Sequence, residues 1–238
     1  MSSPQVPAQP VLELDGIVRG YQSLRPLRLQ SLIVNEAERV ALLGIDAPAA
    51  EVLINLVTGA ALPEAGTVRV MGRDTAAITT GDDWLASLDR FGIVSPRAVL
   101  IEAATIEQNL AMSFTLQIDP IPPEIAARVS ALAAECGIPA DALTQKTGDA
   151  SPALRTRVHF ARALAPEPAL LLLEHPTASL PDAARRAFAD DVVRVLEGRR
   201  VTTLAITQDK AFATRVGRAL ELVPATGVLK PVRRGWFG

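Results

Sequence analysis

The sequence predicts an α/β fold whose central sheet is largely parallel. In the second half of the chain, apolar strands at 169–174 (ALLLLE) and 201–206 (VTTLAI) flank a helical segment at 181–197. Strands that alternate with helices are typical of parallel sheets covered by helices. Upstream, residues 11–43 alternate in a strand-like way, and with the turn-rich stretch 63–74 they indicate a small antiparallel layer beside the first core strand.

Proline, glycine and apolar spacing mark the helices. Pro48 suits the first turn of a helix that Gly59 follows. The chain becomes helix-rich over 97–165, after a short strand at 92–94. The helices that these signals predict cover 48–58, 82–91, 123–136, 152–164, 181–197 and 210–216.

Composition narrows the function classes. The 238 residues suffice for one large domain or a domain with a subdomain, and the net charge of −2 gives no electrostatic footprint for DNA or RNA. Cys136 is the only cysteine, which excludes an intrachain disulfide and fits a reduced, cytoplasmic setting. No apolar run reaches the roughly 18–20 residues that span a bilayer. Residues 1–10 are expected to be a disordered tail.

A phosphate-binding loop is the most informative motif, because its frame is present and its key residues differ. Residues 40–59 read as a strand, Gly44, a small-residue loop and an apolar helix. The working motif is G-x-x-x-x-G-K-[ST], in which Lys reaches the phosphates and Ser or Thr holds Mg²⁺. Counted from Gly44, these last three positions hold Ala49, Ala50 and Glu51.

The chain resembles the nucleotide-binding subunit of ATP-binding cassette (ABC) transporters from about residue 11 to about residue 223. The segments that carry the resemblance, in order, are 62–74, 105–114, 157–181 and 205–216. The resemblance implies a P-loop NTPase (ABC ATPase) fold over 11–229, with a RecA-like core, an antiparallel β subdomain and a helical subdomain at about 97–160. It also implies a head-to-tail dimer in which each ATP lies between one chain's loop and the other chain's signature.

The resemblance assigns nucleotide-site positions one residue at a time. Around the phosphates these are Gly44, Asp46, Ala49, Ala50, Glu51 and Val52. Asp46 is expected either to cap the helix, where its carboxylate would compete with phosphate, or to be a plain surface residue. Tyr21 stands where the family stacks an aromatic ring on adenine, although an aromatic in a strand is commonly core.

The signature and the Q-loop also differ from the family. The signature LSGGQ aligns with 150–154, where Ser151 could bond a phosphate or act as the N-cap of the next helix. Pro152 replaces a glycine and has no N–H to offer. The Q-loop glutamine falls at Ser95 or Pro96.

The catalytic positions carry unusual residues. Glu174 stands at the Walker B aspartate, His175 at the catalytic glutamate and Gln208 at the switch histidine. His175 is a candidate base or a polar residue at a strand end. No lysine lies near the loop, because the three lysines are Lys146, Lys210 and Lys230.

These departures together predict a non-catalytic subunit, since phosphoryl transfer depends on positioning and on neutralising charge. ATP and Mg²⁺ are expected to bind weakly if at all, and no metal site is assigned. The expected partner is a membrane permease, docked on a surface around 95–109, or an active sister ATPase, so that the membrane is reached only through a partner. The alternatives are a slowly hydrolysing subunit that uses Glu174, His175, Ser151 and Gln208, and an interaction module outside transport. The basic and aromatic stretch 230–238 is either an anchor or a frayed terminus.

Overall fold

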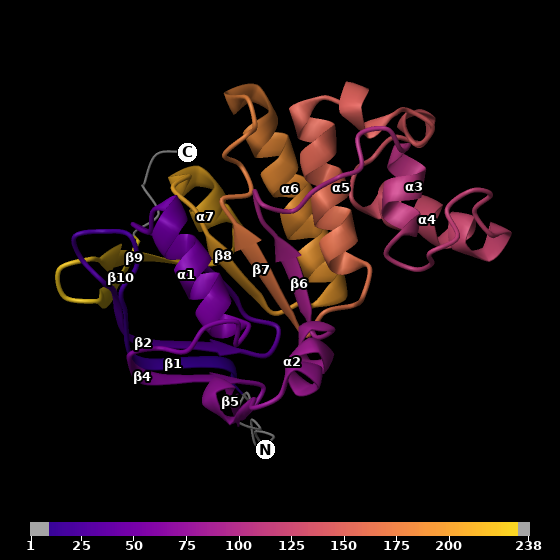
Figure 1. The fold of residues 1–238 in the computed structure, drawn as a ribbon. Coiled ribbons are helices and arrows are strands. Elements are labelled where there is room, and N and C mark those ends of the chain that lie inside the picture. The colour runs from indigo at the N-terminus through magenta and orange to yellow at the C-terminus, as the bar shows by residue number, and fades with distance from the viewer. Residues whose placement is uncertain (1–9, 233–238) are drawn as a thin grey trace, which may run out of the picture.

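A computed structural model describes residues 10–232 and contains two sheets flanked by helices (Figure 1). The strands are β1 (Pro10–Arg19), β2 (Leu27–Asn35), β3 (Arg39–Leu43), β4 (Ala65–Val70), β5 (Arg73–Asp74), β6 (Phe91–Val94), β7 (Leu170–Glu174), β8 (Thr203–Ile206), β9 (Arg218–Val223) and β10 (Val228–Pro231). The helices are α1 (Ala47–Val57), α2 (Gly81–Leu88), α3 (Ile106–Ala111), α4 (Pro123–Glu135), α5 (Pro152–Leu164), α6 (Asp182–Arg199) and α7 (Lys210–Val216).

The larger sheet forms the core and has the strand order β10-β9-β3-β8-β7-β6. All neighbouring strands from β9 through β6 pair in parallel, whereas β10, at the edge of the sheet, pairs antiparallel with β9. Alternate residues of β7 enter different cores, as a strand buried on both faces requires. Leu170 and Leu172 pack on the side of α1, whereas Leu171 and Leu173 pack on the side of α5, α6 and α7.

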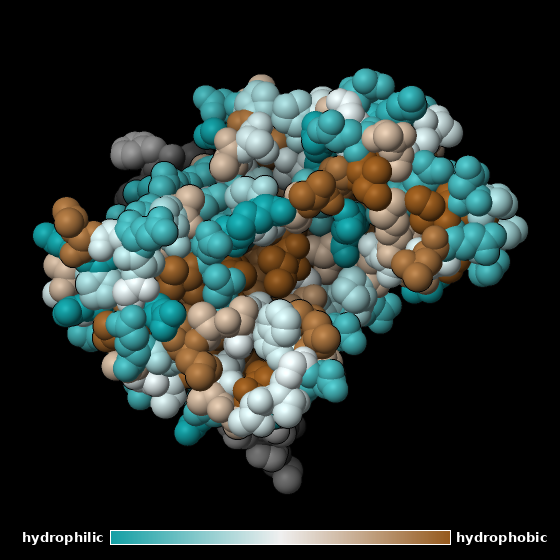
Figure 2. Space-filling model, in the orientation of Figure 1, coloured by the Kyte–Doolittle hydropathy of each residue, from teal (hydrophilic) through white to brown (hydrophobic). Residues whose placement is uncertain are grey.

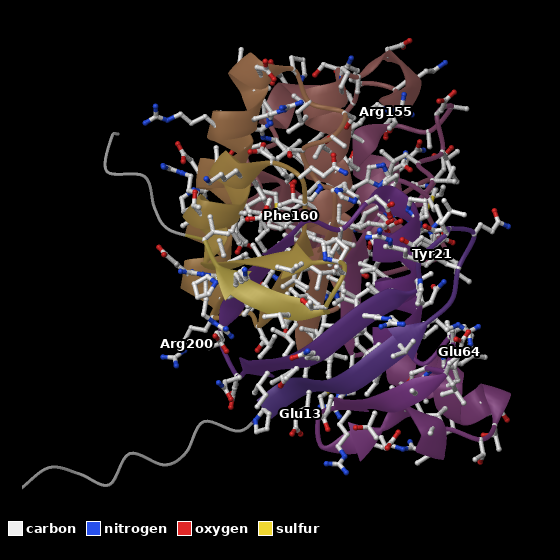
Figure 3. All side chains as sticks on the ribbon, turned by 90° about the vertical axis from the view of Figure 1, so that its left-hand side faces the viewer. Glu13, Tyr21, Glu64, Arg155, Phe160 and Arg200 are labelled. Atoms are coloured by element: carbon white, nitrogen blue, oxygen red, sulfur yellow. The ribbon has the colours of Figure 1, made fainter. Side chains whose placement is uncertain are left out.

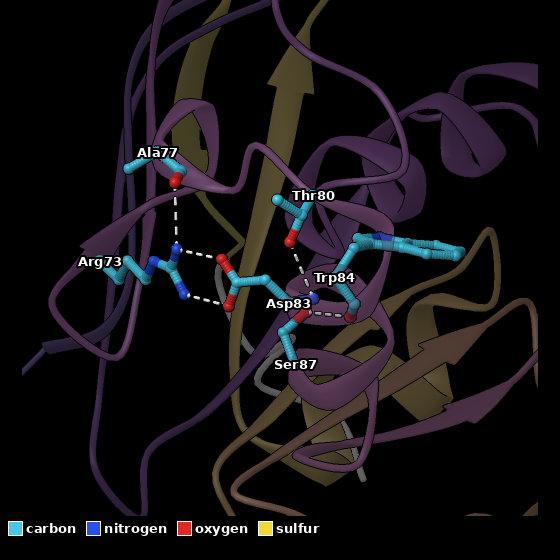
Figure 4. A network of polar contacts seen from close by, with 6 residues as sticks. All are labelled: Arg73, Ala77, Thr80, Asp83, Trp84 and Ser87. Atoms are coloured by element: carbon cyan, nitrogen blue, oxygen red, sulfur yellow. Dashed lines mark hydrogen bonds and ion pairs between the residues drawn. The ribbon is translucent and has the colours of Figure 1, made fainter.

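The smaller sheet is antiparallel, with the order β2-β1-β4-β5. One of its faces shares the core with α1, through residues such as Leu14 and Val68. An exposed polar network joins its edge to α2 (Figure 4). There Arg73 donates to both carboxylate oxygens of Asp83, while Thr80 caps the helix by accepting the amide of Asp83.

The predicted α/β fold with an antiparallel layer is confirmed, and the predicted helix at 152–164 matches α5 to the residue. Two boundaries were wrong. Pro10, expected in the N-terminal tail, is the first residue of β1, and Lys230, expected in the C-terminal tail, pairs with Glu221 inside β10. Pro10 has no N–H, but the first residue of a strand tolerates that loss. Pro231 also lies in β10, and the amide of Val232 donates to the Ala219 carbonyl oxygen, whereas residues 1–9 and 233–238 of the predicted tails lie outside the described residues.

The segment between β6 and β7 forms a lobe that carries α3 and α4 and leads into α5 (Figure 1). Buried Asn109 holds the backbone where the chain enters this lobe. Its side chain accepts the amide of Ile101 and donates to the carbonyl oxygens of Ile101 and Thr105. Within residues 10–232, no helix combines the length and the apolar character that crossing a bilayer requires.

Candidate functional site

In the loop between β3 and α1, an aspartate of the loop itself binds a backbone N–H group at the start of the helix. The Asp46 carboxylate accepts the amide of Ala49 at 2.9 Å and thereby caps α1. This contact satisfies one of the free N–H groups at the helix start, where an external anion would otherwise bind. Gly44 has φ +79°, and a Cβ there would lie 2.7 Å from the Leu222 carbonyl oxygen, so its glycine is explained by contact with β9.

The four candidate positions from 49 to 52 lie on the first turns of α1. Ala49 and Ala50 are buried and pack in the apolar core with residues such as Leu53. Glu51 and Val52 are partly exposed. Ala50, at the position of the motif's lysine, therefore contributes a methyl group to the core and no cation to the loop.

Arg97 supplies a cation from a different segment. Its guanidinium donates to both oxygens of Glu174, at 2.9 and 2.7 Å, and its Nη1 lies 3.3 Å from the Glu51 carboxylate. The Glu174 side chain is only 1% exposed, whereas the Arg97 side chain is 44% exposed. A bidentate arginine–carboxylate pair is among the stronger polar contacts, and here it neutralises a buried charge at the end of β7.

The sheet topology explains why these groups meet. β6 and β7 are parallel neighbours, with Val94 paired with Leu173, so the residues that follow both strands emerge at the same edge. A turn then positions Arg97, whose amide donates to the Ser95 hydroxyl at 3.2 Å. Sequence reasoning singled out Ser95 and Pro96 but missed Arg97. The sequence did contain a signal for this pair. Arg97 lies three residues after one core strand, and Glu174 ends the next core strand.

Ser151 is the N-cap of α5. Its Oγ accepts the amide of Leu154 at 3.3 Å, and Pro152 occupies the first helical position. The capping interpretation of Ser151 therefore fits the structure. α5 and α1 thus begin in the same way, with a side-chain cap and a proline in the first turn.

Tyr21 and the α1 loop line a common cavity of about 270 Å³, which we call the tyrosine cavity. Tyr21 is partly buried against the core that contains α1 (labelled in Figure 3). The other residues that line this cavity include Arg25, Gly44, Asp46 and Ala49. Tyr21, Gly44, Asp46 and Ala49 are thus brought together, as the resemblance implies.

His175 and Gln208 follow the neighbouring strands β7 and β8. His175 adopts φ +43°, a conformation that residues other than glycine seldom adopt, and its amide donates to the Ile206 carbonyl oxygen at 2.7 Å. Its Nε2 is buried and has no hydrogen-bond partner among the described residues. Gln208 is exposed.

Sequence comparison relates the chain to transporter subunits. The model of the ABC transporter family matches residues 27–178. The phosphonates import ATP-binding protein PhnC of Anaeromyxobacter dehalogenans is 31% identical over 95% of this chain and 49% of the relative, so the chain spans about half of that protein. The lipoprotein-releasing system ATP-binding protein LolD of Pseudomonas fluorescens is 28% identical, over 85% of this chain and 88% of LolD.

Solved structures show the same fold. The dimeric bacterial ABC transporter cassette MJ0796 superposes with a TM-score of 0.74, at 19% identity, over 94% of this chain and 100% of that one. The cbiO1 subunit from Clostridium perfringens gives a TM-score of 0.74, at 20% identity, over 95% of this chain and 88% of that one. Because more than half of its length lies inside the family match, the chain belongs to the ABC transporter family.

Proposed function

We propose that this chain is a non-hydrolysing ABC subunit that acts as a scaffold or regulator for a membrane permease or an active sister ATPase. The observation that carries the proposal is the contact of Arg97 with Glu174 and Glu51. By the family resemblance, Glu174 and Glu51 stand at the two positions that hold Mg²⁺. In this chain a tethered guanidinium bridges both carboxylates.

The residues around the loop do not fit Mg-ATP. The Asp46 carboxylate accepts the Ala49 amide that would face a phosphate, and its negative charge repels one. Buried Ala50 offers no cation in place of the motif's lysine. Because both Glu174 oxygens already accept hydrogen bonds from Arg97, a hydrated Mg²⁺ would have to displace a bidentate ion pair from a nearly buried carboxylate. No step of ATP hydrolysis is therefore assigned to these residues.

A surface beside Arg97 supports the proposed permease contact. Val99 is 77% exposed and Ile101 is 49% exposed, and the segment that carries them crosses from the core to the helical lobe. Figure 2 shows a hydrophobic patch at this crossing. The backbone beneath the patch is fixed, because Arg162 donates to the Val99 carbonyl oxygen and Asn109 holds Ile101. Exposed apolar side chains on a loop whose backbone is hydrogen-bonded suit a protein partner.

The proposed location is the cytoplasmic face of the membrane, reached through the permease. We propose no cargo for this subunit, because its relatives PhnC and LolD are named for different ones, phosphonates and lipoproteins. The proposed dimer is head-to-tail, with a second copy or with a sister ATPase.

Isothermal titration of the purified chain with Mg-ATP tests the proposal. We expect no saturable binding at millimolar nucleotide and no phosphate release. Micromolar, Mg²⁺-dependent binding would instead support the slowly hydrolysing alternative. A matched test of partnership is reconstitution with a permease encoded beside this chain: Val99→Asp should abolish the complex, whereas Leu116→Asp, at another exposed apolar position, should not. A wild-type chain that binds no such permease and no sister ATPase would favour a module outside transport.

A further inference from the structure

A pocket distinct from the tyrosine cavity lies at the C-terminal end of α1. It has a volume of about 240 Å³ and is enclosed by the end of α1, the end of β4, the turn after β5, α2 and the start of β6. We call it the α1–α2 pocket. In Figure 2 a hollow with hydrophobic residues at its base lies between β5 and α2. The apolar lining consists of Val57, Val70, Met71, Ile78, Ala86 and Phe91.

The α1–α2 pocket is separate from the nucleotide-site positions. It shares no lining residue with the tyrosine cavity, and none of the positions that the family resemblance assigns to the Q-loop, the signature, the metal or catalysis lines it. Asp46 caps the first turn of α1, whereas Val57 ends the helix, and eleven residues of α-helix span roughly 16 Å. A ligand in this pocket would therefore lie at the far end of the helix from the phosphate-binding loop.

Polar contacts join the walls of the pocket. Trp84 Nε1 donates to the Thr58 carbonyl oxygen at 3.0 Å, which ties α2 to the end of α1. Arg73 donates to both carboxylate oxygens of Asp83, which ties β5 to α2 (Figure 4). The pocket is thus formed before any ligand enters, as is usual for sites that bind small molecules.

Most polar groups in the lining already have partners. The hydroxyls of Thr58 and Ser87 donate to backbone carbonyl oxygens of α1 and α2. The charges of Arg73 and Asp83 neutralise each other, because their contact is bidentate. None of these four side chains needs a ligand to complete its contacts.

The exceptions are the Thr75 hydroxyl and the Arg90 guanidinium. Thr75 Oγ1 is buried and forms no hydrogen bond within residues 10–232. The exposed Arg90 side chain forms neither a hydrogen bond nor an ion pair in that part of the chain. A buried hydroxyl without a partner is costly and marks a place where a polar ligand atom or a water fits. Arg90 carries the one uncompensated charge among the residues that line the pocket.

Volume, lining and charge together restrict the ligand. A cavity of about 150 Å³ with apolar walls can hold benzene, so the 240 Å³ of this pocket can hold a larger apolar body. A single guanidinium at the edge of an apolar lining suits one negative group at the end of that body. A carboxylate matches the planar fork of a guanidinium and can accept two hydrogen bonds from it.

We propose that the α1–α2 pocket binds a small amphiphilic carboxylate, with its apolar chain against Val57, Ile78 and Phe91 and its carboxylate on Arg90. This site goes beyond the proposed scaffold function, because it requires neither ATP nor a protein partner. It would remain if the tyrosine cavity were found to bind nucleotide.

Methionine-methyl NMR of the full chain tests the proposal, because the chain has only three methionines and Met71 lines the pocket. Octanoate is the probe, titrated below the concentration at which it forms micelles. We expect the Met71 signal to shift saturably, while the signal of Met112, at the end of α3, stays in place. Octylamine has the same chain with the opposite charge, and acetate has the carboxylate without the chain. Both should bind far more weakly than octanoate.

Arg90→Gln tests the carboxylate contact. It should weaken octanoate binding roughly fivefold, the size of a partly exposed ion pair, and leave the binding of 1-octanol unchanged. Octanoate affinity that Arg90→Gln does not lower would overturn the proposal.

Ala86→Phe tests the apolar part of the site, because it adds a ring to the lining from an exposed position on α2. It should abolish the Met71 response to octanoate while the circular dichroism spectrum stays that of the wild type. Leu85→Phe, on the same helix but outside the lining, is the matched control and should leave the dissociation constant unchanged. A wild-type Met71 signal that does not move with octanoate, or that moves equally with octylamine, would also overturn the proposal.

Discussion

The N-termini of α1 and α5 differ in one respect that matters for ligands. Both helices carry a side-chain cap and a proline in the first turn. The cap of α1 is the carboxylate of Asp46, whereas the cap of α5 is the neutral hydroxyl of Ser151. Because a helix N-terminus attracts anions, the charged cap fills that role itself at α1, whereas the neutral cap at α5 adds no negative charge to its helix terminus.

The surroundings of the two helices strengthen the contrast. Near α1, Arg97 is bound by Glu51 and Glu174, so the carboxylates and the cation there satisfy one another. Near α5, two imidazoles remain without partners among the described residues. Within one cassette fold, the carboxylates and the cation beside α1 thus satisfy one another, whereas the two imidazoles beside α5 form no hydrogen bond within residues 10–232.

The largest expected effect comes from Arg97→Ala. This change leaves the nearly buried Glu174 charge without its bidentate partner and should lower the free energy of unfolding by roughly 2–3 kcal/mol. The value is below that of a fully buried pair because the Arg97 side chain is 44% exposed. Urea unfolding measures the loss. The double variant Arg97→Ala/Glu174→Gln should recover most of it, and equal losses in the single and double variants would contradict the pairing.

The cap of α1 should have a smaller effect. Asp46→Ala removes the acceptor for the Ala49 amide and should cost about 1 kcal/mol. Asp46→Ser restores a neutral cap of the kind found at α5 and should have nearly wild-type stability. Thermal unfolding of the two variants distinguishes a cap from a plain surface residue, for which alanine and serine would behave alike.

The comparison can also be tested at α5, by replacing the neutral cap Ser151 with a charged one. Ser151→Asp should keep α5 capped and leave the unfolding midpoint unchanged, because aspartate and serine are comparably good N-caps. Thermal unfolding measures this, and a lowered midpoint would show that a carboxylate does not replace the Ser151 cap.

The smallest expected effect is a pH dependence. Burial lowers the pKa of His159, and the charges of Arg162 and Arg155 lower it further. The unfolded chain, with a pKa near 6.5, therefore binds a proton at a pH where the folded chain does not. The free energy of unfolding should decrease as the pH falls from about 7 through about 6.5. His159→Gln should reduce that slope in urea unfolding, and an identical slope would contradict the assignment.

Local signals in the sequence predicted much of the fold. The start of α5 follows from Ser151 and Pro152, and the Asp46 cap follows from a contact only three residues away. Interactions of this range need no knowledge of topology. The element boundaries were less accurate at Pro10 and Lys230, where pairing with another strand extends a β-strand past its sequence signal.

The contacts that define the site could not be predicted in the same way. Arg97 and Glu174 are 77 residues apart, and their meeting depends on β6 and β7 being parallel neighbours. His159 carries no signal of its own on an amphipathic helix. It comes into the same cavity as His175 only because α5 packs beside the turn after β7.

A crystal structure of the chain grown with excess Mg-ATP is the most direct test of the central claim that Arg97 takes the place of a divalent cation. We predict that the Arg97 guanidinium remains bidentate on Glu174 and that no metal ion binds between Glu174 and Glu51. A Mg²⁺ ion between these carboxylates, with Arg97 displaced and the triphosphate along residues 44–52, would contradict the account.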